Sequence, residues 1–166
     1  GWLDNYAKAF DCVNHDILIK KLNFYGIRGI SLNWFQSYLN NRKQLVRAND
    51  TDSSLKNIVC GVPQGSVLGP LLFFIFINDI TNLKINGKFF LFADDTSITW
   101  SNSTIASLHE TITSDLLTIK TWPDSNLLSF TVDKTVALSY KGAIQPLPLN
   151  NSQISTVDSV KFLGIF

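Results

Sequence analysis

Two adjacent acids, Asp94 and Asp95, separate two strand-like segments, and no other feature of the sequence restricts the fold as strongly. The segments Phe89–Ala93 and Thr96–Trp100 are rich in aromatic and β-branched residues, which is typical of strands. Strands this close in sequence form a hairpin, so both carboxylates are expected at its turn. Turn geometry tolerates aspartate, but these flanking strands should be half buried.

A divalent cation explains why two carboxylates would be placed at such a turn. Burying them side by side costs desolvation and mutual repulsion. A bound cation offsets both costs, and Mg²⁺ prefers carboxylate oxygens together with substrate phosphates. We therefore predict that Asp94 and Asp95 contribute to a metal site.

A further carboxylate must come from elsewhere in the chain if two metal ions act on a phosphoryl group. Residues 1–6 are expected to form a short strand that contains Asp4, and Asp11 follows it. Asp11 is more simply interpreted as a residue at the entry to the next helix. Asp4 is therefore the stronger candidate for a second metal ligand.

The remaining elements predict an α+β fold, an antiparallel sheet with helices packed on one face. Three helices are expected besides these strands. The first begins after Asn14 as N-cap and ends at Gly26, and the second begins after Ser31 as cap and ends at Asn40–Asn41. The third covers Ser66–Ile80, which is apolar on nearly all sides. A fourth amphipathic helix should begin at Ser103 and end at Trp122–Pro123. The other expected strands are Gln44–Arg47, Leu55–Cys60, a turn and strand over Ser129–Tyr140, and Val160–Phe166, with a loop over residues 142–153.

The loop Gly61–Gly65 leads into the start of a helix. Glycines let a backbone approach a ligand closely, and a helix N-terminus favours anions. Gln64 could hydrogen-bond a sugar or a base, although a Pro-Gly loop before a helix is usually only a turn. Lys134, which follows Asp133, could neutralise or protonate a pyrophosphate leaving group, or be an exposed lysine at a strand end.

Composition places few limits on function. The 166 residues fit one domain, and 45% hydrophobic with 16% charged residues is ordinary for a globular protein. Net charge is +1, although residues 1–60 hold eight Lys/Arg against five Asp/Glu. The longest apolar run, Val67–Ile77, is interrupted by Gly69 and Pro70 and is too short to span a bilayer, so no membrane association is expected.

The location and extent of the chain are also expectations from the sequence. No secretory signal opens the chain, and Cys12 and Cys60 lack metal-ligand spacing. We therefore expect buried, reduced thiols in an intracellular protein of the nucleus or cytoplasm that is not secreted. The sequence contains no Met and stops in the apolar run Phe162–Phe166, so we expect a fragment of a longer protein.

Several blocks of the sequence, taken in order, resemble the reverse transcriptases of non-LTR (LINE-type) retrotransposons. The loop ending in Pro63-Gln64-Gly65, followed about thirty residues later by Phe92-Ala93-Asp94-Asp95, is a specific combination. The other matching blocks are Lys8–Asp11, Val13–Leu18, Tyr25–Ile30, Trp34–Leu39, Asn41–Gln44, Ser66–Phe73, Asn126–Ser129, Val132–Thr135 and Val160–Gly164. The resemblance covers essentially the whole chain. It implies the palm of a right-hand polymerase over residues 1–166, with most of the fingers and the thumb missing.

The resemblance also implies an activity and the residues that carry it. The activity is RNA-templated DNA synthesis with two Mg²⁺ ions, or Mn²⁺ in their place; the partners are an RNA template, a DNA primer and dNTPs. Asp94 and Asp95 would be the catalytic and metal-binding acids, joined by Asp4 or by the residue at position 5. Phe10 would exclude ribonucleotides beside the ribose 2′ position. The remaining implied roles are nucleotide binding at Gln64, Gly65 and Lys134 and a primer grip at Phe162, Leu163 and Gly164.

One position departs from the family pattern. The first catalytic Asp of the family lies six residues before Asp11, and here that position is Asn5, with Asp4 one residue further back. Neighbouring strand residues point to opposite faces, so both cannot face the metal without a bulge. We favour the alignment on Asn5. Asparagine holds Mg²⁺ less well than a carboxylate, so this alignment puts the catalytic activity of the chain in doubt.

The alternatives are a group II intron maturase or viral RNA polymerase, a non-catalytic remnant that binds nucleic acid or protein, and a plain α+β binding module.

Overall fold

The computed structural model describes residues 2–5, 9–92, 95–128, 135–140, 142, 144–149 and 152–160, with the backbone alone for residues 2–5 and 9. The chain divides into two compact units. Unit 1 comprises Gly1–Ala7 and Ile80–Phe166, and unit 2 comprises Lys8–Asp79.

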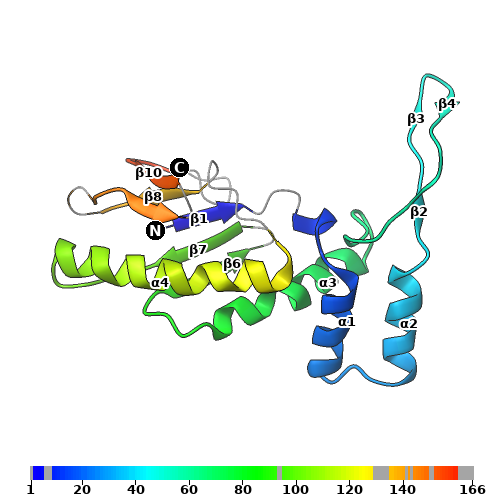
Figure 1. The fold of residues 1–166 in the computed structure, drawn as a ribbon, viewed down its shortest axis with the longest axis horizontal. Helices are drawn as coiled ribbons and strands as arrows, with labels where there is room; N and C mark the ends of the chain where they lie inside the picture. Colours follow the sequence, from blue (N-terminus) through cyan, green and yellow to red (C-terminus); the bar gives the residue numbers. More distant parts are fainter. Residues whose placement is uncertain are drawn as a thin grey trace. The chain divides into compact units, whose positions relative to one another are not determined.

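Unit 1 is built on a sheet in the order β6-β7-β1-β8-β10-β9, drawn in Figure 1. Its strands are β1 (Trp2–Asn5), β6 (Lys88–Phe92), β7 (Asp95–Thr99), β8 (Val136–Leu138), β9 (Leu147–Leu149) and β10 (Ser152–Val157). Neighbouring strands within the described residues are antiparallel except β8 and β10, which are parallel. The predicted α+β fold and the hairpin of β6 and β7 are confirmed.

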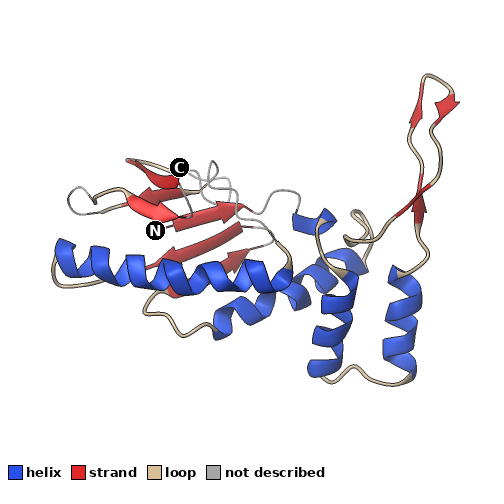
Figure 2. Ribbon diagram, viewed as in Figure 1, coloured by secondary structure: helices blue, strands red, loops and turns tan. Residues whose placement is uncertain are grey.

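A single long helix, α4 (Ile105–Asn126), lies along one face of this sheet (Figure 2). Buried residues of α4 pack against buried residues of β7, β8, β9 and β10. The members of this core are Ile98, Ile112, Leu116, Ile119, Ala137, Leu147, Leu149 and Ile154. The stripe predicted from the sequence was Ile105, Leu108, Ile112, Leu116 and Ile119. Its last three residues are buried in this core, Leu108 is partly buried, and Ile105 at the start of the helix is exposed.

The ends of α4 differ from the prediction. The cap is Thr104, not Ser103, because the Thr104 hydroxyl accepts the Ser107 N–H. The helix also continues through Pro123 to Asn126, where Leu127 adopts a left-handed conformation. Trp122, Pro123 and Asn126 are buried, so packing compensates for the backbone hydrogen bond that proline cannot donate.

The last part of unit 1 corrects two expectations. Residues 142–153, predicted to be a loop, contain β9 and the start of β10. β9 buries Leu147 and Leu149, and β10 buries only Ile154 among polar residues. Strands this short, one containing a proline and the other mostly polar, lack a strong apolar pattern in the sequence. The strand predicted over Val160–Phe166 is not supported at Val160, and the rest of it lies outside the described residues.

Unit 2 contains a 3-10 helix (Ala9–Asp11) and the helices α1 (His15–Phe24), α2 (Ile30–Leu39) and α3 (Leu68–Ile77). A second 3-10 helix, Asn78–Asn82, begins in unit 2 and continues in the sequence into unit 1. Asn14 caps α1 as predicted, because its side chain accepts the Ile17 N–H. The predicted cap of α2 is wrong: Gly29 occupies that position, with φ 58°, and Ser31 lies inside the helix. The fully buried side chains of unit 2 come from all three helices and include Leu18, Leu22, Leu39, Leu72, Phe73 and Phe76.

Between α2 and α3 the chain forms a long arm, residues 42–59, that extends beyond the helices of unit 2 (Figure 1). Instead of the two longer strands predicted, the arm has two short ladders, β2 (Lys43–Gln44) with β5 (Lys56–Asn57) and β3 (Arg47–Ala48) with β4 (Thr51–Asp52). All eight of these residues are exposed, so no buried face extends the pairing.

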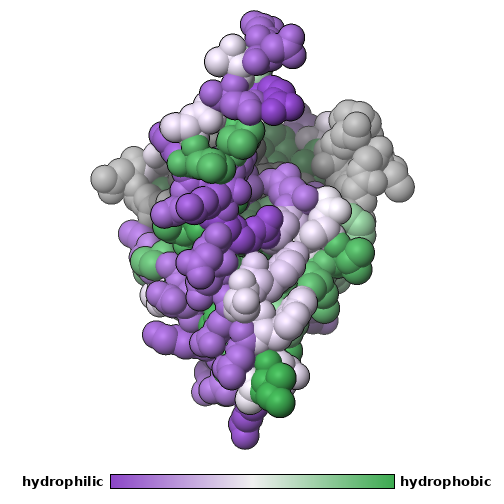
Figure 3. All heavy atoms as spheres, turned by 90° about the vertical axis from the view of Figure 1, so that its right-hand side faces the viewer, coloured by the Kyte–Doolittle hydropathy of each residue, from purple (hydrophilic) through white to green (hydrophobic). Residues whose placement is uncertain are grey.

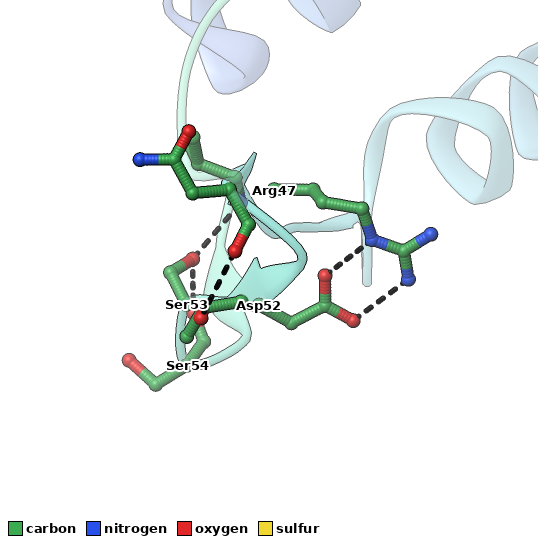
Figure 4. A network of polar contacts seen from close by, with 7 residues as sticks. Arg47, Asp52, Ser53 and Ser54 are labelled. Atoms are coloured by element: carbon green, nitrogen blue, oxygen red, sulfur yellow. Dashed lines mark hydrogen bonds and ion pairs between the residues drawn. The ribbon is translucent and has the colours of Figure 1, made fainter.

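Local contacts close the tip of the arm (Figure 4). Arg47 donates two hydrogen bonds to Asp52, at 2.6 and 2.9 Å, which lowers the pKa of the Asp52 carboxyl and raises the pKa of Arg47. Val46 donates its N–H to the Ser53 hydroxyl at 2.9 Å and accepts the Ser53 N–H at 2.8 Å. The charge of Arg47 is therefore compensated within the arm.

A partly buried ion pair joins α1 to the end of α3. Lys21 Nζ lies 2.7 Å from Asp79 Oδ1, donates to the Phe76 carbonyl at 2.5 Å and lies 4.5 Å from the Phe76 ring centroid. Burial lowers the pKa of Lys21, while the hydrogen bond and the charge of Asp79 act in the opposite direction.

Changing Asp79→Asn should destabilise unit 2 by about 1–2 kcal/mol, because the Lys21 charge stays in a largely buried place without its carboxylate. Lys21→Met should have a smaller effect, since a methionine retains contact with the Phe76 ring and leaves no buried charge. Urea denaturation of both variants measures the difference. Equal losses of stability in the two variants would contradict the argument from the uncompensated charge.

Cys12 and Cys60 form no disulfide and are exposed, not buried as predicted. Val13, next to Cys12, takes the buried position, and Cys60 follows the exposed arm. Within the described residues, no helix combines the length and the apolar character needed to cross a bilayer.

Candidate active site

The hairpin in unit 1 places Asp95 at the start of a strand. Phe92 of β6 pairs with Asp95 of β7, which leaves residues 93 and 94 between the two strands. Asp95 is half-buried, in agreement with the expectation that these carboxylates are partly removed from water. Asp94 lies outside the described residues.

The opening strand, β1, pairs with β7 in a register that places the two candidate β1 positions opposite the start of β7. Asn5 is the direct partner of Asp95, and Asp4 is the direct partner of Thr96. Direct partners in an antiparallel pair occupy the same face of the sheet. Thr96 belongs to the buried face, together with Ile98, which packs in the core with α4. Position 5 therefore shares the face of Asp95, and position 4 shares the buried face.

In unit 2, the loop Gly61–Gly65 is attached to the segment that precedes α1. Gly61 donates its N–H to the Val13 carbonyl at 2.8 Å, and Val62 donates to the Phe10 carbonyl at 2.8 Å. His15, which is buried, places Nε2 2.8 Å from the Gly61 carbonyl. These bonds hold the predicted nucleotide-binding loop against the residues around Phe10.

A cavity of about 550 Å³ opens beside this loop. Gln64 lines it and donates from Nε2 to Asp11 Oδ1 at 2.8 Å, so Asp11 acts on the loop and is not the entry residue of α1. The other lining residues are Arg42, Gln44, Ile58, Cys60, Gly61, Val62 and Pro63. The wall of the cavity thus carries amides, a carboxylate and a guanidinium, which are groups that bind sugars, bases and phosphates.

The predicted gate residue, Phe10, and the loop before α3 both make contacts that fix their positions within unit 2. The Phe10 ring stacks on the Phe73 ring of α3, with 4.4 Å between centroids and 23° between planes. The Ser66 hydroxyl donates to the Pro63 carbonyl at 2.7 Å and accepts the Gly69 N–H at 2.9 Å, which fixes the loop at the helix N-terminus. Gly65 has φ 77°, a conformation that favours glycine.

Two residues of the cavity, Arg42 and Gln44, were not predicted as site residues. They belong to the block Asn41–Gln44, whose charge and amide were the available signal. The side chains of Asp4 and Asn5 are not described, and Lys134, Phe162, Leu163 and Gly164 lie outside the described residues. Among the side chains that the structure describes, no group of three or more His, Cys, Asp or Glu residues could hold a metal ion.

The fold is that of a reverse transcriptase-type polymerase. A solved structure of telomerase from Candida albicans, in complex with a fragment of telomeric RNA, superposes with a TM-score of 0.61 over 95% of this chain and 30% of that one, at 13% identity. The chain belongs to the reverse transcriptase (RNA-dependent DNA polymerase) family, which matches residues 5–166. Members of this family generally use divalent metal ions.

Similar curated proteins come from mobile elements of insects. The RNA-directed DNA polymerase from the mobile element jockey of Drosophila funebris is 30% identical over 95% of this chain, and the probable polymerase from transposon BS of Drosophila melanogaster is 28% identical over 95%. A third, from the X-element of Drosophila melanogaster, is 42% identical over 56% of the chain. The predicted relation to non-LTR retrotransposon polymerases is confirmed. The chain spans 18% and 19% of the length of the first two relatives.

Proposed function

We propose that this chain is the palm region of an RNA-directed DNA polymerase that adds dNTPs to the 3′-OH of a DNA primer on an RNA template. The observation that supports the proposal most strongly is the direct pairing of position 5 with Asp95 in the central sheet. Two-metal phosphoryl transfer requires metal ligands from two such strands, and this pairing places position 5 beside Asp95, although position 5 is an asparagine in this chain.

In the proposed site, Asp94 and Asp95 would hold Mg²⁺, or Mn²⁺ in its place, together with a ligand from β1. Bound metal ions would lower the pKa of the primer 3′-OH and stabilise the charge on the leaving pyrophosphate. The register favours position 5 over Asp4 as the β1 contribution, because Asp4 pairs with the buried Thr96. In this chain that contribution is an amide, which binds Mg²⁺ less well than a carboxylate.

Residues of unit 2 would hold the incoming nucleotide. Gln64 and Gly65 would contact its sugar and phosphates from the loop before α3, with Gln64 oriented by Asp11. Phe10, supported by the Phe73 ring, would exclude a ribose 2′-OH by steric clash. Lys134 as proton donor and Phe162–Gly164 as primer grip are further parts of the proposal.

The second candidate function is a nucleic-acid-binding remnant that has lost catalysis. Asn5 favours it, because this position would hold one carboxylate fewer than the family pattern. The two candidates predict different results when the carboxylate is restored.

Asn5→Asp should raise the affinity of the chain for Mn²⁺ at least about tenfold, because a charged ligand joins Asp95 on one face of the sheet. Isothermal titration calorimetry measures this. The double variant with Asn5→Asp and Asp4→Asn is the matched control, and it should bind Mn²⁺ as tightly as Asn5→Asp alone. If Asp4→Asn removes Mn²⁺ binding and Asn5→Asp adds none, Asp4 is the ligand and the register argument fails.

Primer extension on an RNA template, with the change made in the full-length protein, separates the two functions. Synthesis that appears with Asn5→Asp identifies a polymerase damaged at one ligand. Improved Mn²⁺ binding without synthesis identifies the remnant.

A further inference from the structure

The outer side of α2 carries a row of stacked side chains. Trp34, Tyr38 and Arg42 follow one another at intervals of four residues, which places them along one side of a helix and its C-terminal end. The Trp34 and Tyr38 rings are stacked, with 5.3 Å between centroids and 12° between planes. The Arg42 guanidinium lies 5.7 Å from the Tyr38 ring centroid. The row therefore consists of two parallel rings with a cation at one end.

This row lies at the surface and not in the core. Trp34 is 51% exposed and Ile30, one turn before it, is 89% exposed. Leu39 is the buried residue of α2. The mutual stacking and the cation–π contact hold the rings in one orientation, so a flat ligand would meet a surface that is already ordered.

The segment of the sequence that contains this row carries only positive charge. Residues 17–49 contain six Lys or Arg and no Asp or Glu. Within the described residues, Lys21 and Arg47 form ion pairs with Asp79 and Asp52. No described carboxylate lies within ion-pair distance of Arg42 or Lys43, so their charges are available to a polyanion.

A polar cavity of about 580 Å³ lies at the arginine end of the row. Its wall combines these two cations with amides and one acid, Asp16, from α1. The lining residues that matter here are Asn40, Asn41, Asn57, Arg42, Lys43 and Asp16. Figure 3 views the side on which α2 and the arm lie, and the surface there is mostly hydrophilic, with separate apolar patches. A broad apolar docking surface for a protein is therefore not what this side offers.

We propose that the outer side of α2 binds a single-stranded nucleic acid, with a base stacked on the Trp34–Tyr38 rings and the adjoining phosphates held by Arg42 and Lys43. Aromatic rings accept bases only from a strand whose bases are unpaired, because a duplex covers the base faces. Cations beside the rings neutralise the backbone, and the amides of the cavity can hydrogen-bond base edges or sugar hydroxyls. The proposal does not depend on catalysis.

The test measures binding of fluorescent twelve-nucleotide rU and dT strands, and of a duplex of equal length, to the 166-residue chain by anisotropy in EDTA. Trp34→Leu should weaken single-strand binding at least about fivefold, and Trp34→Phe, which retains a ring, should weaken it less. Arg42→Gln should reduce the slope of log affinity against log salt by about one. Phe24→Leu, at an aromatic that is 80% exposed on α1, and Lys120→Gln, an exposed lysine on α4, are the matched controls and should bind as the unaltered chain does.

Photo-crosslinking locates the contact. A strand that carries 4-thiouridine should crosslink within the tryptic peptide Gly29–Arg42, which contains no internal Lys or Arg. Equal binding of rU and dT would indicate recognition of bases and phosphates, and tighter binding of rU would add contacts to the 2′-OH. Unchanged affinity of both Trp34→Leu and Arg42→Gln, or equal binding of the duplex, would overturn the proposal. A Trp34→Leu variant that loses only self-association would assign the surface to a second copy of the chain instead.

Discussion

Replacing Asp115 with alanine should destabilise unit 1 by about 3–5 kcal/mol, the largest effect that we expect from any single side chain in this unit. Asp115 lies on α4 and is 3% exposed. Its carboxylate accepts the N–H groups of Asn86 and Gly87 at 2.8 and 3.0 Å, the Asn86 amide at 3.0 Å and the Trp100 indole N–H at 2.7 Å. Truncation leaves four donors without their acceptor.

These bonds fasten α4 to the open end of the β6–β7 hairpin, opposite the turn next to Asp95. Urea denaturation followed by far-UV circular dichroism measures the loss of stability. Asp115→Asn keeps one acceptor oxygen and should lose about half as much. Asp124→Ala changes an exposed aspartate of the same helix and should stay within about 0.5 kcal/mol of the unaltered chain. If Asp115→Ala and Asp124→Ala are equally stable, Asp115 does not hold the hairpin.

The second large effect is expected at Gly61, where alanine should destabilise unit 2 by more than about 2 kcal/mol. Gly61 has φ 88°, and a Cβ there would lie 2.8 Å from the carbonyl oxygen and 2.9 Å from the Cα of Asp11. Both atoms belong to the backbone, so relief requires the loop and the segment before α1 to separate. That movement would also break the bond between Gln64 and Asp11.

Gly65→Ala provides the matched control for this substitution. Gly65 also has a positive φ, of 77°, but nothing lies within 4 Å of an added Cβ. Gly65→Ala should lower the free energy of unfolding by only about 1 kcal/mol, which is the cost of placing alanine in a left-handed conformation. Thermal denaturation of the two variants therefore separates the cost of the left-handed backbone from the cost of the clash between an added Cβ and the Asp11 backbone. Equal losses would mean that the contact between Gly61 and Asp11 contributes nothing beyond the left-handed conformation.

Local patterns predicted the parts of the fold whose determinants are close in sequence. The hairpin followed from the aromatic and β-branched residues on both sides of Asp94-Asp95, and the cap at Asn14 followed from its side chain and the apolar periodicity after it. The cap of α4 was misplaced by one residue, because Ser103 and Thr104 are both good caps and only the structure selects one. The extension of α4 through Pro123 depends on burial of Trp122, which is a tertiary contact.

In the candidate site, too, motifs close in sequence were predicted, whereas pairings between distant parts of the chain were not. Resemblance to a family identified Gln64, Phe10 and position 5, but it left open whether Asp4 or Asn5 aligns with the hairpin. That alignment depends on the pairing of β1 with a strand about ninety residues away, which no local pattern encodes. Asp115 escaped notice because an acid on an amphipathic helix resembles a solvated residue until its partners from another element are known.

The position of β1 in the sheet has a consequence for how the chain matures during synthesis. β1 leaves the ribosome before the other strands of this sheet, yet its neighbours are β7 and β8, with Trp2 opposite Ile98 and Ala137. Contacts so distant in sequence form late, because the loop entropy must be overcome first. The strand that carries position 5 therefore pairs only after β7 and β8 have been translated, and the face that position 5 shares with Asp95 is completed only then.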